Sequence, residues 1–74
     1  MSDLNDALGR VFRELRERRG VSQEALALEC ELHRTYVGQI ERGLKSPTVR
    51  TLFVIAKGLG VAPSEILRRV EKEL

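Results

Sequence analysis

The chain has 74 residues, of which 42% are hydrophobic, 32% charged and only 4% aromatic, and its formal net charge is +2. This length suits one small domain, so we expect residues 1–74 to form a single domain, and the aliphatic, aromatic-poor composition favours an all-α bundle. The sequence excludes a membrane span, a signal peptide, an internal disulfide and a cysteine metal cluster, because it has no apolar run of roughly 20 residues, no basic-then-apolar start and a single cysteine. These exclusions predict a soluble cytoplasmic protein.

The first helix is expected from about Asp3 to Arg19, with Asp3 or Asn5 as its cap. The other faces of this helix carry many arginines. We interpret most of these arginines as a solvated surface with local ion pairs to Glu14 and Glu17. The apolar stripe that predicts the buried face consists of Leu4, Leu8, Val11, Phe12 and Leu15.

Two short helices are expected between Ser22 and Gly43. Gly20 can end the first helix and Ser22 can cap the second. Apolar residues recur at helical spacing on both sides of a break near Glu31. This pattern predicts two amphipathic helices that fold onto one core. Cys30 is expected to be a small core residue, with a redox sensor as the alternative. The apolar positions are Leu26, Cys30, Leu32, Val37 and Ile40.

The second of these helices offers a polar face without carboxylates. Because each residue of an α-helix is rotated by about 100° from the one before it, one face carries Arg34, Thr35, Gly38, Gln39 and Arg42. An α-helix fits the major groove of DNA, where Arg34 could bind guanine, Gln39 adenine, and Thr35 a base edge or a thymine methyl. The alternative for Arg34 is an exposed charge on a solvated helix, which we disfavour because the face has no acidic partner.

Further polar residues are candidates for contacts to the DNA backbone, which would fix the register without reading sequence. Gln23 lies in a first helical turn, where free amides suit a phosphate oxygen; alternatively it faces water. Tyr36 either packs at the core edge or reaches DNA with its hydroxyl. For the others, the alternative is solubility. The full set is Gln23, His33, Tyr36, Arg42, Lys45, Ser46 and Arg50.

Two more helices are expected after caps at Thr48 and at Ala62–Pro63. The buried stripe of the fourth helix is predicted as Val49, Leu52, Ile55, Ala56 and Leu59, and that of the fifth as Ile66, Leu67, Val70 and Leu74. The surplus of apolar residues beyond one small core predicts a dimer interface; alternatively, the same residues complete the core of the monomer. The interface residues are predicted to be Phe53, Val54, Ile66, Val70 and Leu74.

The segment 22–43 resembles the helix-turn-helix of the phage repressor and Cro family, also called the XRE family, and most resembles its small stand-alone members such as restriction–modification controller proteins. The resemblance rests on Gln23, Leu26–Ala27, Cys30, Leu32, Val37, Ile40 and the closing Glu41-Arg42-Gly43. It implies a partly buried ion pair between Arg16 and Glu41. One position departs from the family pattern, because Glu31 stands where the turn usually has glycine; a left-handed backbone there would cost about 1 kcal/mol.

These observations predict a five-helix, repressor-like fold. The function they favour is a dimeric regulator that binds a palindromic operator in double-stranded DNA, with RNA polymerase as a further partner if it activates transcription. No cofactor, metal or small-molecule ligand is expected. The alternative is an antitoxin-type module that neutralises a protein partner. An enzyme is the weakest hypothesis, since His33 and Cys30 supply no catalytic constellation.

Overall fold

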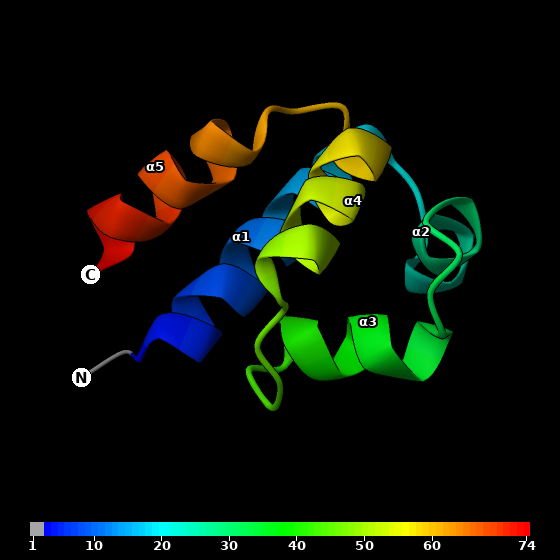
Figure 1. The fold of residues 1–74 in the computed structure, drawn as a ribbon, viewed down its shortest axis with the longest axis horizontal. Helices are drawn as coiled ribbons and strands as arrows, with labels where there is room; N and C mark the ends of the chain where they lie inside the picture. Colours follow the sequence, from blue (N-terminus) through cyan, green and yellow to red (C-terminus); the bar gives the residue numbers. More distant parts are fainter. Residues whose placement is uncertain (1–2) are drawn as a thin grey trace.

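The computed structural model of the chain describes residues 3–74, in which five helices and no strands are present (Figure 1). This confirms the all-α, five-helix prediction. None of the helices in these described residues is long and apolar enough to span a bilayer. The helices are α1 (Leu4–Arg19), α2 (Gln23–Glu29), α3 (Arg34–Glu41), α4 (Val49–Leu59) and α5 (Pro63–Glu73).

Capping side chains begin four of the helices, and three of these caps were expected from the sequence. The Asp3 carboxylate accepts a hydrogen bond from the backbone N–H of Asp6 at 2.8 Å. The hydroxyls of Ser22 and Thr48 each accept one at 3.0 Å, three residues into α2 and α4. The His33 ring caps α3, and α5 begins instead with proline at its first turn. Local chemistry therefore determines where the chain can start a helix.

The core lies between α1 and the other helices. Both α3 and α5 pack against α1, whereas α2 packs against α3 and α4. Figure 1 shows α5 and α3 on opposite sides of the molecule, with α1 and α4 between them. The largest fully buried side chains, which come from every helix, are Phe12, Leu26, Ile40, Ile55, Ile66, Val11 and Val70.

Gly9 sets how closely α1 and α3 approach each other. A Cβ atom at this position would lie 2.5 Å from the carbonyl oxygen of Glu41 and 2.6 Å from that of Ile40. Such distances are far shorter than any normal contact, so only glycine lets the C-terminal turn of α3 rest on the α1 backbone. The sequence analysis did not single out Gly9, because its partners lie 31 and 32 residues away in the chain.

Several residues expected in the buried stripes are exposed instead. Val49 is 73% exposed in the first turn of α4, directly after the Thr48 cap. Leu4, Leu67 and Leu74 are also substantially exposed, and they line a shallow groove between α1 and α5. The stripe predictions were therefore wrong at these four positions and right at the other positions of the α1, α4 and α5 stripes.

Candidate nucleic-acid interface

The turn between α2 and α3 holds a non-glycine residue in a left-handed conformation. Glu31 has a φ of 56°, and it alone among the non-glycine residues described has a positive φ. The next residue, Leu32, donates its N–H to the carbonyl oxygen of Ala27 at 2.8 Å, which closes the turn. Glu31 therefore occupies the position that favours glycine, with the backbone strain that the sequence analysis anticipated.

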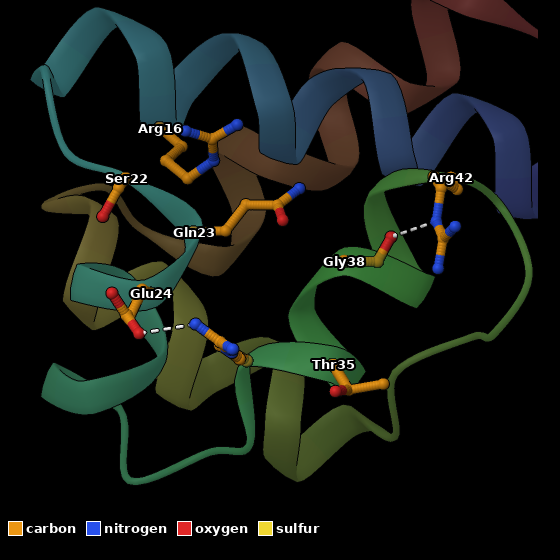
Figure 2. A pocket seen from close by; sticks show the side chains of 8 residues that line it. Arg16, Ser22, Gln23, Glu24, Thr35, Gly38 and Arg42 are labelled. Carbon is orange, nitrogen blue, oxygen red and sulfur yellow. Dashed lines mark hydrogen bonds and ion pairs between the residues drawn. The ribbon is translucent and has the colours of Figure 1, made fainter.

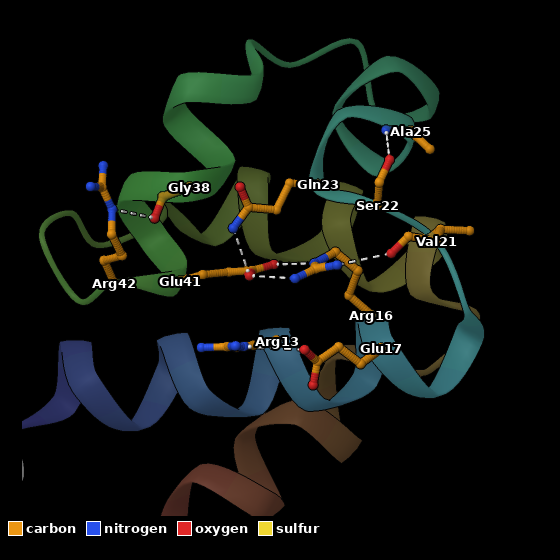
Figure 3. Close-up of polar contacts among 10 residues, drawn as sticks. All are labelled: Arg13, Arg16, Glu17, Val21, Ser22, Gln23, Ala25, Gly38, Glu41 and Arg42. Atoms are coloured by element: carbon orange, nitrogen blue, oxygen red, sulfur yellow. Dashed lines mark hydrogen bonds and ion pairs between the residues drawn. The ribbon is translucent and has the colours of Figure 1, made fainter.

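A buried ion pair ties α1 to the C-terminal turn of α3 (Figure 3). Arg16 donates from Nε to Glu41 Oε2 at 2.6 Å and from Nη2 to Glu41 Oε1 at 3.0 Å. Its Nη1 donates to the carbonyl oxygen of Val21 at 2.9 Å. The two charged side chains are only 12% and 2% exposed, and the hydrogen bonds to Glu41 raise the pKa of Arg16 above its usual value. The pair expected from the resemblance is present, with two parallel hydrogen bonds.

Gln23 joins this network from α2. Its amide Nε2 donates to Glu41 Oε1 at 2.9 Å, which fixes the side chain across the junction of α2 and α3. A Cβ atom on Gly38 would lie 3.3 Å from Gln23 Oε1, and Gly38 itself is buried. The lack of a side chain at Gly38 therefore leaves room for Gln23 at the junction of α2 and α3.

A surface groove runs along the junction of α2 and α3, with Arg16 of α1 at its base (Figure 2). It brings together four of the residues predicted to contact DNA, namely Gln23, Arg34, Thr35 and Arg42. Glu24 of α2 also lines the groove, and its Oε2 lies 2.7 Å from Nη1 of Arg34. The expectation that Arg34 has no acidic partner was wrong, because the partner comes from α2 rather than from the face of α3.

The other candidates do not line this groove and lie at the start of α3, on α3 and after it. His33 is held at the start of α3, where its Nδ1 accepts the N–H of Thr35 at 3.2 Å. Tyr36 is partly buried and packs against the core, and Gln39 is half-buried on the next turn. Within the groove lining, Arg42 donates from Nε to the carbonyl oxygen of Gly38 at 3.3 Å. The last three, Lys45, Ser46 and Arg50, are exposed in the α3–α4 connection and the first turn of α4.

The expected dimer-interface residues lie in three different places. Ile66 and Val70 are 0% and 2% exposed, so their assignment to an interface was wrong; they face α1 and α4 from one side of α5 and complete the core of the monomer. Phe53 and Val54 are exposed and line an apolar groove on α4, defined by Phe53, Val54, Lys57, Val61 and Pro63. Leu74 is exposed in the separate groove between α1 and α5.

Comparison with known proteins identifies the architecture. The sequence model of the helix-turn-helix family matches residues 12–66. The chain belongs to this family. Helix-turn-helix proteins of the XRE type are DNA-binding transcriptional regulators, which confirms the expectation that the chain is not an enzyme.

Curated relatives within the helix-turn-helix family include several control proteins. The chain is 43% identical over 60 residues to control protein C.BamHI of Bacillus amyloliquefaciens, which covers 80% of this chain and 74% of the relative. It is 36% identical to control protein C.MunI of a Mycoplasma species over 99% of this chain and all of the relative. These relatives give no support to the antitoxin alternative.

Solved structures show the same helix-turn-helix fold. The restriction–modification controller protein C.Esp1396I superposes with a TM-score of 0.87 and is 34% identical, covering 99% of this chain and 94% of that one. The clp gene regulator ClgR of Corynebacterium glutamicum superposes with a TM-score of 0.93 at 26% identity, covering 97% of this chain and 77% of that one. C.Esp1396I has also been solved as a tetramer in complex with its natural 35-base-pair operator.

Proposed function

We propose that this helix-turn-helix protein is a controller-type regulator that acts as a dimer on a palindromic operator. The observation that carries the proposal is the groove between α2 and α3, where exposed Arg34 and Thr35 lie beside Gln23 on one surface. The control proteins it resembles over most of its length support the controller assignment. We further propose that the protein works in the cytoplasm and that residues 1–74 act as one domain.

In the proposed complex, α3 lies in the major groove and its exposed side chains read base edges. Arg34 donates two hydrogen bonds to a guanine, Gln39 pairs with an adenine, and Thr35 contacts a base edge or a thymine methyl. Each well-formed paired contact contributes about 1–3 kcal/mol of discrimination, so a half-site of a few base pairs is specified. The residues proposed to contact the DNA backbone are Gln23, His33, Tyr36, Arg42, Lys45, Ser46 and Arg50.

The twofold partner is proposed to dock on the apolar groove of α4. Phe53 is 59% exposed at its rim, and the neighbouring Val54 and Val61 extend the apolar surface. A twofold dimer places two α3 helices one turn of DNA apart, about 34 Å, as a palindrome requires. A solved relative binds its operator as a tetramer, which supports assembly beyond one chain. Activation through a contact with RNA polymerase is proposed as a second mode of action, beside repression by occupancy.

Selection of bound duplexes from a random DNA pool, at near-physiological salt, tests this function. We expect an inverted repeat to be enriched, with half-site centres about 10 base pairs apart. A titration against salt should accompany it, because backbone contacts alone release counterions without enriching any sequence. Binding that enriches nothing and disappears as salt rises would refute the operator proposal.

Arg34→Ala tests the assignment of the reading residues. We expect the variant to lose discrimination at one base position of each half-site by about 1–3 kcal/mol, because the paired contact to guanine is removed. The melting temperature should change little, since Arg34 is 67% exposed and its ion pair to Glu24 is equally exposed. A large loss of stability, with discrimination intact, would instead show a structural role for Arg34.

A further inference from the structure

Glu24 is a carboxylate placed on a surface that is proposed to face phosphates. Among the residues that line the groove between α2 and α3 it is the sole acid, with Arg16, Arg34 and Arg42 as the bases. An acid at this place repels every DNA duplex, whatever its sequence. We therefore ask how Glu24 changes the DNA contacts of Arg34, the basic residue with which it forms an ion pair.

The contact between Glu24 and Arg34 depends on how the two helices pack. Glu24 lies in the first turn of α2 and Arg34 at the start of α3, and the turn between them brings Oε2 within 2.7 Å of Nη1. In Figure 2 the dashed line that starts at Glu24 marks this ion pair. Both side chains are about two-thirds exposed, at 71% and 67%, so the pair is weak enough for DNA to rearrange it.

We propose that Glu24 is a specificity-determining residue that competes with DNA phosphates for Arg34. This inference rests on the proposed operator-binding function and deepens it. On unrelated DNA, Arg34 has no guanine to bind, and the carboxylate keeps it from contacting a phosphate. On the operator, the guanidinium fork donates to guanine through two of its five N–H groups and retains Glu24 through another. Glu24 thus weakens non-specific binding more than operator binding.

Glu24→Gln is the direct test, because it removes the charge and keeps the size of the side chain. We expect affinity for unrelated duplex DNA to rise about two- to fivefold, as for the loss of an exposed ion pair, while affinity for the selected operator stays within about twofold. The slope of log affinity against log salt on unrelated DNA should steepen by about 0.9, since Arg34 gains one phosphate. The ratio of operator to non-specific affinity should fall accordingly.

Two matched variants separate this effect from a general change in charge. Glu71→Gln makes the same change in net charge on α5, on the far side of the molecule from α3, and should leave the ratio unaltered. Adding Glu24→Gln to Arg34→Ala should leave the ratio equal to that of Arg34→Ala alone, because Glu24 acts through Arg34. The melting temperatures of all variants provide a check on folding.

The outcomes distinguish this inference from the proposed function. If the parent chain selects no operator, the proposed function fails before Glu24 is tested. If the parent selects an operator and Glu24→Gln tightens both kinds of binding equally, Glu24 only repels the backbone and the inference is overturned. A loss of operator affinity in Glu24→Gln would overturn it as well, since the carboxylate would then be needed to place Arg34 on its base.

Discussion

At the scale of single residues, Glu31 is the position where the chain departs most clearly from the optimal local chemistry. Its left-handed backbone, with a φ of 56°, costs a residue with a Cβ atom about 1 kcal/mol that glycine avoids. Within residues 3–74, the Glu31 side chain makes no hydrogen bond that offsets this cost. The residue is exposed, so its replacement disturbs no packing.

Glu31→Gly should therefore raise the free energy of unfolding by about 1 kcal/mol, measured by urea or thermal denaturation. Glu31→Ala is the control: it removes the carboxylate but keeps Cβ, so its stability should stay close to that of the parent. Equal stabilisation by alanine and glycine would show that charge, and not backbone strain, sets the stability at this position.

Residue types predicted some of these local features well and others not at all. Ser22, Thr48 and Pro63 mark helix starts because capping depends on atoms only a few residues apart. The strain at Glu31 was anticipated from the family resemblance, because the turn of that family usually has glycine at this position. The pairing of Glu24 with Arg34 was missed because it depends on the angle between two helices, which the spacing of residues in the sequence does not contain.

At the scale of helices, the Arg16–Glu41 pair decides how α3 is held on α1. Glu41→Ala should lower the free energy of unfolding by about 3–5 kcal/mol, because it leaves the guanidinium of Arg16 desolvated without its partner. Chemical denaturation of the purified variant measures this. The loss should also free Gln23, whose amide donates to Glu41.

Glu17→Ala is the matched control for the helix-scale prediction. Glu17 pairs with Arg13 four residues away on α1 at 3.3 Å, and both side chains are more than half exposed. Its removal should change stability by less than about 0.5 kcal/mol. If Glu41→Ala and Glu17→Ala change the free energy of unfolding equally, the buried pair does not contribute more to stability than an exposed one.

The number and order of the helices could be predicted from apolar periodicity. Which residues of each apolar stripe are buried could be predicted only in part. A stripe identifies the face of a helix that can be buried, and the neighbouring helices decide how far along its length burial extends. This explains why Leu52 and Ile55 are buried and Val49 of the same stripe is exposed. It also explains why Ile66 and Val70, which looked surplus to one small core, are needed to fill it.

At the scale of the whole molecule, two separate apolar surfaces are candidates for the interface of the proposed dimer. We propose the groove on α4 around Phe53, and Phe53→Asp should convert the dimer to a monomer by placing a charge in the interface. Sedimentation or light scattering measures the mass. Folding should be retained, because Phe53 lies outside the buried core.

Leu67→Asp supplies the comparison for the whole-molecule prediction. Leu67 is exposed in the groove between α1 and α5, so this variant should stay dimeric. If Leu67→Asp breaks the dimer and Phe53→Asp does not, the interface lies on α1 and α5 instead. Loss of operator binding together with loss of the dimer would connect assembly to recognition.

The position of Tyr36 gives this molecule an optical reporter of its own. The chain has one tyrosine and no tryptophan, so its intrinsic ultraviolet fluorescence arises from this single ring. The ring sits partly buried on α3, the helix proposed to enter the DNA groove. Emission intensity therefore reports on the surroundings of that helix and anisotropy on the tumbling of the molecule, and rapid mixing with a duplex can follow docking without an attached dye.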